Sequence, residues 1–300
     1  MAQGFVAVIG GVNVDITAAT RGLFVVGDSI PGEVALACGG VARNIAHNLH
    51  LLGHTVRFVS MFGGDVFGKI CHNDCQELGL DLTLSERHDS ARNGLYLCVN
   101  DNSGEMVVAV ADMDIVKNIT PDFLSERMGD INQAATIVAD SNLETESLQY
   151  LLENARAPLF IDTVSTAKAA RVVTALKSGN HVLHTLKLNR LEALISTESD
   201  TVEQAARWFV DHGVQHVFIT LGAQGVLCAD AHRQTTLPAE PTQVVNATGA
   251  GDAFLSAVVH AHLLGEPTER QAAWGLRAAH LALLSQAAVN PEISTLTQQY

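Results

Sequence analysis

The sequence predicts an α/β protein with a mostly parallel sheet covered by helices on both faces. Short apolar runs typical of strands recur along the 300 residues, and segments with helical periodicity lie between several of them. Hydrophobic residues make up 47% of the chain and charged residues only 17%, against roughly 25% in an average soluble protein, so much of the sequence must be buried. These values exclude a disordered or coiled-coil protein.

The strands and helices of this core follow one another from the first residues onward. The run 5–9 ends in two glycines, and the residues Ile45, Leu49 and Leu52 recur at helical spacing in 41–52, as do apolar residues in 202–212. The predicted strands of the core are 5–9, 56–61, 136–139, 159–161, 216–220 and 225–228. Alternation of strands with helices favours parallel pairing.

Two segments interrupt this alternation. Residues 13–36 have the composition of extended chain with turns, and 94–111 contains two strands around the turn 101–104. We expect them to pair as a small antiparallel sheet that projects from the main one.

Charge and cysteine content limit the partners and the compartment. Lys and Arg total 18 against 32 Asp and Glu, and the net charge of −14 disfavours a nucleic-acid polymer or an anionic membrane surface as partner. Five scattered cysteines do not make a disulfide framework, and no basic leader or membrane-spanning run is found. We therefore expect a soluble, cytoplasmic protein.

The most informative motif is the glycine-rich stretch 246–252, which runs directly into an apolar helical pattern. Glycine lets backbone N–H groups approach a ligand, and a helix N-terminus favours a phosphate or a developing oxyanion. Asp252 would lie in the first turn, where it can accept a proton from a nearby alcohol. Alternatively, Asp252 only complements the helix dipole and the glycines serve packing.

A second glycine-to-helix junction places Asn44 in the first turn after Gly39 and Gly40. Asn13 and Asp15, two residues apart, would share one face of an extended segment and suit the hydroxyls of a polyol or ribose. Ordinary turn and capping chemistry explains either cluster taken alone.

Two further strand ends are candidates for a nucleotide and its metal. Asn189 and Glu192 would share a helix face, where the carboxylate could hold water around Mg²⁺, although Asn189 as a simple helix cap is the favoured reading without context. Thr220, Gly222 and Gly225 end another strand in a glycine turn, and ligands of open α/β sheets lie off the carboxyl ends of strands.

Two other patterns are rejected as sites. The stretch 63–69 has the spacing of a P-loop, but Ile70 stands where the magnesium-binding hydroxyl belongs. Cys71 and Cys75 lie one helical turn apart and are more simply explained as buried thiols than as metal ligands.

Taken together, Gly39-Gly40 with Asn44 and the stretch 248–252 resemble the two signatures of the ribokinase-like (PfkB) carbohydrate and nucleoside kinases. The order of Asn13-x-Asp15, the G-G-D-x-x-G stretch, Asn189-x-x-Glu192 and Thr220-x-Gly222 agrees, so the resemblance covers essentially the whole chain. Within the family, the stretches 39–53, 104–115 and 186–193 look most like those of pseudouridine kinases.

The resemblance implies a ribokinase-like three-layer α/β/α core, built from 1–12, 37–91 and 113–300, with a β-sheet lid formed by 13–36 and 92–112. It implies ATP-dependent phosphorylation of the 5'-hydroxyl of pseudouridine, with Asp252 as the base and the N–H groups of Gly249, Ala250 and Gly251 as the anion hole. Alternatives are another nucleoside or sugar acceptor, or a non-catalytic ligand-binding protein on the same fold.

The resemblance also distributes the remaining site residues. The acceptor residues are Asn13, Asp15, Gly39, Gly40, Asn44, Asn142 and, for the base, Asp112. The nucleotide residues are Asn189, Thr220, Gly222, Gly225, Ala279 and Asn290, with Glu192 holding Mg²⁺ through water.

Two departures from the family pattern and one surface property add expectations. Leu188 replaces a common proline, which should affect rigidity more than chemistry. Asn246 replaces an aspartate that helps organise a monovalent-cation site in many relatives, so we expect a weak or absent K⁺ requirement; a large rate increase on adding K⁺ at fixed ionic strength would contradict it. The exposed edges of a lid sheet predict a homodimer through the lid.

Overall fold

The computed structural model describes residues 4–299 and is built around one large sheet. The strands of this sheet are β1 (Val6–Ile9), β4 (Val56–Val59), β9 (Thr136–Asp140), β10 (Leu159–Asp162), β11 (Leu183–Asn189), β12 (Val214–Thr220), β13 (Val226–Ala229) and β14 (Gln234–Leu237). Their order is β14-β13-β12-β11-β10-β9-β1-β4. In this order, neighbouring strands pair in parallel from β12 through β11, β10, β9 and β1 to β4. At the other edge, β12 with β13 and β13 with β14 pair antiparallel.

Helices cover both faces of this sheet. One face carries α3 (Pro121–Ile131), α4 (Thr145–Asn154), α5 (Thr166–Lys177), α6 (Arg190–Thr197) and α7 (Val202–Asp211), and the other carries α1 (Val41–Leu51), α8 (Ala250–Leu263) and α9 (Thr268–Leu283). Short 3-10 segments are η1 (Asp114–Asn118), η2 (Gly222–Gln224) and η3 (Pro291–Gln299). Alternate residues of β9 serve the two cores: Ile137 and Ala139 pack on one side and Val138 on the other. The predicted three-layer α/β/α class is confirmed.

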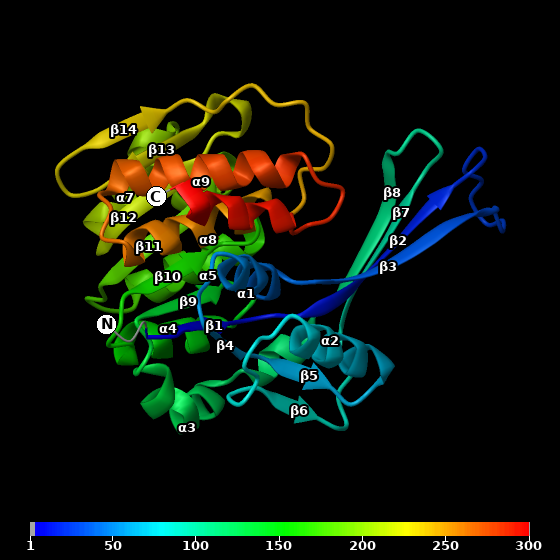
Figure 1. Cartoon of the computed structure of the whole chain (residues 1–300), viewed down its shortest axis with the longest axis horizontal. Helices are drawn as coiled ribbons and strands as arrows, with labels where there is room; N and C mark the ends of the chain where they lie inside the picture. Colours follow the sequence, from blue (N-terminus) through cyan, green and yellow to red (C-terminus); the bar gives the residue numbers. More distant parts are fainter. Residues whose placement is uncertain (1–3, 300) are drawn as a thin grey trace.

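A second sheet projects from the core as a long arm (Figure 1). Its strands are β2 (Asn13–Thr20), β3 (Gly32–Gly39), β7 (Gly94–Asn100) and β8 (Met106–Asp112), in the order β3-β2-β7-β8. We call it the small sheet. The sequence predicts an antiparallel sheet, and β2 with β3 and β7 with β8 do pair in that way. However, β2 and β7 pair in parallel because both leave the core in the same direction. Asn13 pairs with Gly39 at the end of the small sheet nearest the core.

The predicted strand 56–61 is broken in two. The hydroxyl of Ser60 donates to the carbonyl of Gly10 at 2.7 Å, and the backbone N–H of Ser60 donates to Ser85 at 3.0 Å. These bonds turn the chain, so that β5 (Met61–Gly63) leaves the large sheet and pairs with β6 (Glu86–His88).

The P-loop-like stretch 63–69 proves to be a packing motif at the start of α2 (Val66–Glu77). Asp65 caps this helix by accepting from the N–H of Gly68 at 2.9 Å. A Cβ on Gly68 would lie 2.0 Å from the carbonyl oxygen of Gly63, so glycine is needed there for close contact between backbones.

Within residues 4–299, no helix is both long and apolar enough to cross a membrane.

Candidate active site

Asp252 lies in the first turn of α8, at the edge of the large sheet where the parallel strands end. The helix begins after Gly249, which has a left-handed φ of 81°. A Cβ on Gly249 would lie 1.9 Å from the carbonyl oxygen of Ala288, so both the conformation and the contact require glycine. The first N–H groups of a helix have no carbonyl partner within it, so this turn can bind an anion beside a carboxylate.

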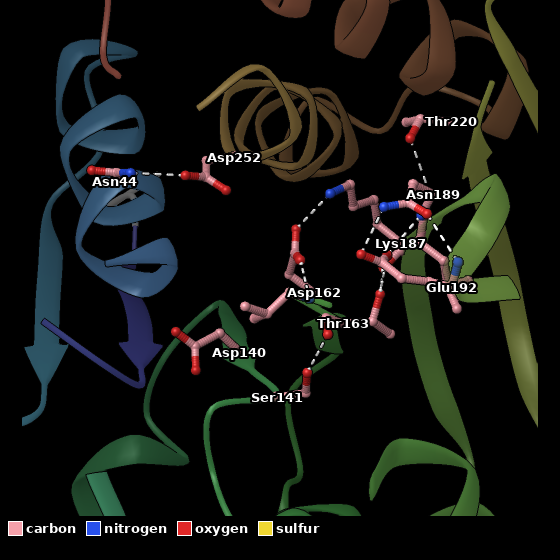
Figure 2. A network of polar contacts seen from close by, with 12 residues as sticks. Asn44, Asp140, Ser141, Asp162, Thr163, Lys187, Asn189, Glu192, Thr220 and Asp252 are labelled. Carbon is pink, nitrogen blue, oxygen red and sulfur yellow. Dashed lines mark hydrogen bonds and ion pairs between the residues drawn. The ribbon is translucent and has the colours of Figure 1, made fainter. Parts of the chain in front are cut away.

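The two glycine junctions predicted from the sequence meet at Asp252. Asn44, in the first turn of α1, donates its side-chain N–H to Asp252 at 2.9 Å across 208 residues of sequence (Figure 2). Before it, Gly40 has a φ of 106°, and a Cβ there would lie 2.5 Å from the carbonyl oxygen of Gly11. The glycine therefore lets α1 start directly against the loop that follows β1.

The pKa of Asp252 is shifted far from its ordinary value. The carboxyl is only 7% exposed, and burial is the largest cause of a pKa raised to about 7. The negative charge of Asp162 adds to the rise, while Lys187 and the hydrogen bond from Asn44 oppose it. A carboxyl with this pKa can both take and release a proton near neutral pH.

Lys187 and Asp162 form a buried ion pair next to the start of α8. The ammonium nitrogen of Lys187 lies 2.9 Å from Asp162 Oδ2, and a Cβ on Gly251 would lie 2.5 Å from the same nitrogen. Glycine at 251 thus leaves room for the ammonium. Burial by itself would lower the pKa of Lys187, but the charges of Asp162, Asp252 and Glu192 outweigh burial and raise it.

Asp140 ends β9 and fixes the backbone around the site. It is fully buried and accepts from the N–H of Gly11 at 3.3 Å, from the N–H of Ala42 at 3.0 Å and from Asn142 Nδ2 at 2.8 Å. Burial raises the pKa of Asp140, and these hydrogen bonds oppose the rise. Asp140 therefore joins β9 to the start of α1.

Asn189 and Glu192 form a capping box at the start of α6. Asn189 Oδ1 accepts from the N–H of Glu192 at 2.9 Å, and Glu192 Oε2 accepts from the N–H of Asn189 at 2.8 Å. Glu192 also accepts from Asn189 Nδ2 at 2.7 Å and from the hydroxyl of Thr163 at 2.7 Å (Figure 2). The helix-cap reading of this motif is therefore correct, and its role toward magnesium stays a prediction.

A cavity of about 230 Å³ lies on one side of the start of α8. Four of the residues predicted for the nucleotide line it: Thr220, Gly222, Gly225 and Ala279. Phe254 and Leu276 make much of its wall apolar, and Ala250 and Gly251, from the start of α8, also line it. Asn290 is not among the lining residues, because its side chain bonds the carbonyl of Leu281 and the N–H of Glu292 at the junction of α9 and η3.

A larger cavity of about 740 Å³ lies between the small sheet, α1 and α2. Asp15 lines it and accepts from Asn13 Nδ2 at 2.6 Å. A Cβ on Gly39 would lie 2.1 Å from Asp15 Oδ2, so only glycine permits this carboxylate position. Arg43 and Asp74 form an ion pair of 2.7 Å in the cavity wall, and Thr248 connects this wall to the start of α8.

Two predicted acceptor residues lie apart from this cavity. Asp112 ends the edge strand β8, where Arg92 approaches it at 3.6 Å, and it does not line the cavity. Asn142 also lies outside the lining, with its amide bound between Asp140 and Lys168. Among the predicted acceptor residues, Asp15 lines this cavity, with Asn13 and Gly39 against its carboxylate, and Asn44 binds Asp252 at the start of α1 after Gly40. Asp112 and Asn142 are not among the residues that line the cavity.

Asn246 bridges two loops beside the start of α8. Its Oδ1 accepts from the N–H of Thr248 at 2.9 Å, and its Nδ2 donates to the carbonyl of Gln286 at 2.9 Å. An amide can make both bonds without a cation, whereas a carboxylate could only accept. The expected weak K⁺ requirement stays a prediction.

Sequence reasoning missed Asp140, Asp162 and Lys187. The predicted strands 136–139 and 159–161 stop one residue before the two aspartates, which in fact end β9 and β10. A polar residue directly after a buried strand was the available signal, because the carboxyl ends of parallel strands form the ligand edge of such sheets. For Lys187, a lone cation within an apolar strand was the signal.

Comparisons with known proteins point to one family. The family model described as pfkB family carbohydrate kinase matches residues 3–295. Pseudouridine kinase of Escherichia coli (strain K12) is 33% identical, with 97% of this chain and 94% of that protein covered. An uncharacterised sugar kinase of the same strain is 29% identical, with 97% and 82% covered. The solved structure of a carbohydrate kinase from Agrobacterium tumefaciens has a TM-score of 0.85 at 27% identity, with 98% and 97% covered.

Proposed function

The chain belongs to the PfkB family of carbohydrate kinases and is a sugar or nucleoside kinase, and on that premise we propose that it transfers the γ-phosphoryl group of ATP to the 5'-hydroxyl of pseudouridine. The observation that carries the proposal is the start of α8, where Ala250 and Gly251 line the apolar cavity, Thr248 lines the polar one, and Asp252 lies in the first helical turn beside them. The similarity to pseudouridine kinase supports the choice of acceptor.

The two cavities suit the two substrates of such a reaction. The apolar walls of the 230 Å³ cavity suit a nucleotide base, with its phosphates directed to the N–H groups of Gly249, Ala250 and Gly251. The 740 Å³ cavity has room for a nucleoside, and the Asn13–Asp15 pair suits ribose hydroxyls. Asp252 lies where the two substrates would meet.

The chemistry then follows from the residues around Asp252. Its carboxylate accepts the proton of the attacking hydroxyl, and Asn44 holds that carboxylate in position. The N–H groups at the start of α8 stabilise charge on the transferred phosphoryl oxygens.

The carboxylate of Glu192, at the start of α6, fits a magnesium ion held through water. Both carboxylate oxygens of Glu192 already accept protein hydrogen bonds, so a water molecule of the ion's shell can reach them more readily than the ion itself. When bound, magnesium neutralises part of the phosphate charge.

The acceptor is tested with a substrate panel. ADP release would be measured with pseudouridine, uridine, adenosine, ribose and fructose at equal concentrations, and we expect pseudouridine to give the highest kcat/KM. Equal rates with all nucleosides, or a preference for a free sugar, would replace pseudouridine by the alternative acceptors. Binding of these compounds without any ADP release would favour a non-catalytic ligand-binding protein.

Replacing the proposed base should remove catalysis but keep binding. Asp252→Asn retains an acceptor for the Asn44 amide, so we expect nucleoside affinity to change little while turnover falls at least about a hundredfold. Calorimetry and steady-state rates measure the two effects. Asp211→Asn, on the exposed end of α7, is the matched control and should behave as the parent chain. Near-normal turnover of Asp252→Asn would remove it from the role of base.

The pH profile should follow the carboxyl of Asp252. Because its pKa is about 7 and the base must be deprotonated, kcat/KM should fall as the pH drops below about 7. Asp162→Asn removes the neighbouring negative charge, so the pKa of Asp252 should decrease and the acid limb should move to lower pH. ATP ionises in the same way with both proteins, so its ionisation does not contribute to the difference between the two pH profiles. If the midpoint of the acid limb in Asp162→Asn stays where it is in the parent chain or moves to higher pH, the acid limb does not report the carboxyl of Asp252.

We also propose that two copies associate through the small sheet. Its edge strands β3 and β8 expose large apolar side chains: Val34, Leu36, Met106, Val108 and Val110. Such a surface is typical of an interface. Light scattering should give the mass of a dimer, and Val34→Glu should reduce it to that of a monomer; a monomeric parent chain would refute the proposal.

A further inference from the structure

Three cysteines gather where the small sheet joins the core. Cys38 lies next to the last residue of β3, and Cys71 and Cys75 lie one turn apart on α2. Cys71 and Cys75 belong to the buried core, and Cys38 packs against it. The strand β3 packs against α2 there, and the side chains of Cys38 and Cys71 interact, each shifting the pKa of the other thiol.

The two thiols differ in access. Cys38 is partly exposed and lines the 740 Å³ cavity, whereas Cys71 is fully buried behind it. A small oxidant that enters the cavity therefore meets Cys38 first. Among the described residues, no group of three or more His, Cys, Asp and Glu is arranged to hold a metal.

The charges around the pair favour thiolate on the accessible sulfur. The hydrogen bond with Cys71 is the largest cause of a lowered pKa for Cys38, and Arg43 adds to it, while burial, Asp74 and Asp15 oppose it. The pKa of Cys71 is raised by the same hydrogen bond and by burial. Because the thiolate is the reactive form, Cys38 is the sulfur that an oxidant attacks.

We propose that Cys38 and Cys71 form a redox pair, in which a peroxide converts them to a disulfide that ties β3 to α2 and stops turnover. In the first step, the Cys38 sulfur attacks one oxygen of hydrogen peroxide, giving Cys38 sulfenic acid and one water. In the second step, the Cys71 sulfur attacks the Cys38 sulfur and a second water leaves. The two thiols lose two electrons, and the peroxide is reduced to two waters.

The position of the bond explains why it inhibits. Gly39 and Gly40 follow Cys38 and connect the small sheet to α1, which carries Asn44. In the same strand, the absence of a side chain on Gly39 leaves room for the Asp15 carboxylate. A disulfide constrains the distance between its two Cα atoms, so it would fix this connection against α2 and alter the cavity wall beside Asp15.

The cross-link is tested directly on the full chain. The reduced protein is treated with hydrogen peroxide, blocked with N-ethylmaleimide and digested with trypsin. Cleavage after Arg21, Arg43, Lys69 and Arg87 releases the peptides 22–43 and 70–87, which we expect to find joined in proportion to lost activity. We expect at least a tenfold loss of turnover and its recovery with dithiothreitol.

Because the peptide 70–87 contains two cysteines, single variants identify the partner. Cys75→Ser should still cross-link, whereas Cys71→Ser should neither cross-link nor lose activity to peroxide; Cys71→Ala replaces it if the serine variant does not fold. Cys98→Ser, in the same small sheet, is the matched control and should respond as the parent chain.

Three results would overturn the proposal: no joined peptide at the peroxide dose that inactivates, equal inactivation of Cys71→Ser, or full turnover of the cross-linked chain. The peptide assay needs no substrate, and the rate assay uses whichever acceptor the panel identifies. Failure of the redox pair is therefore distinguishable from a wrong choice of acceptor.

Discussion

The ammonium group of Lys187 and the carboxylates that surround it determine how this site is built. Lys187 pairs with Asp162 and also feels the charges of Asp252 and Glu192, all of them buried. A buried charge is costly unless it is paired and hydrogen-bonded. Asp162 has the ammonium, and Glu192 has the donors of its capping box, so the unbalanced negative charge falls on Asp252. Burial of that charge is the largest cause of its pKa of about 7, and the neighbouring charge of Asp162 raises the pKa further.

This charge arrangement depends on the register of the parallel strands. Asp140, Asp162 and Lys187 are direct neighbours across β9, β10 and β11. Two adjacent carboxylates would repel each other, but they are turned to different partners: Asp140 binds backbone N–H groups from the β1 loop and α1, and Asp162 binds Lys187. The sheet therefore supplies a row of fixed charges, against which α1 and α8 position Asn44 and Asp252.

The two glycine junctions could be predicted from the sequence as parts of the site, but the row of charges formed by Asp140, Asp162 and Lys187 could not. A glycine pair before Asn44 and a glycine motif before Asp252 have local signals, and the structure joins them 208 residues apart. For Lys187 the local signal, a lone cation within an apolar strand, does not name its partner, because only the pairing of β11 with β10 places it beside Asp162. Asp112 is the opposite case, a residue that was predicted for the acceptor but lies away from the cavity. It belongs to a stretch that resembles relatives, but the strand order of the small sheet places it on the edge strand farthest from β3.

The acidic character of the chain, with a net charge of −14, is compatible with an anionic substrate, and the buried ammonium of Lys187 shows why. Lys187 is compensated by Asp162, so it cannot provide a free positive charge for phosphate. In the proposed reaction, the attraction comes from the N–H groups at the start of α8 and from bound magnesium, while charges beyond about 8 Å are screened at physiological salt. Hydrogen-bond donors close to the phosphate therefore determine its binding more than the net charge of the chain does. The same N–H groups are fixed before any substrate arrives, because Gly249 packs directly on the Ala288 carbonyl.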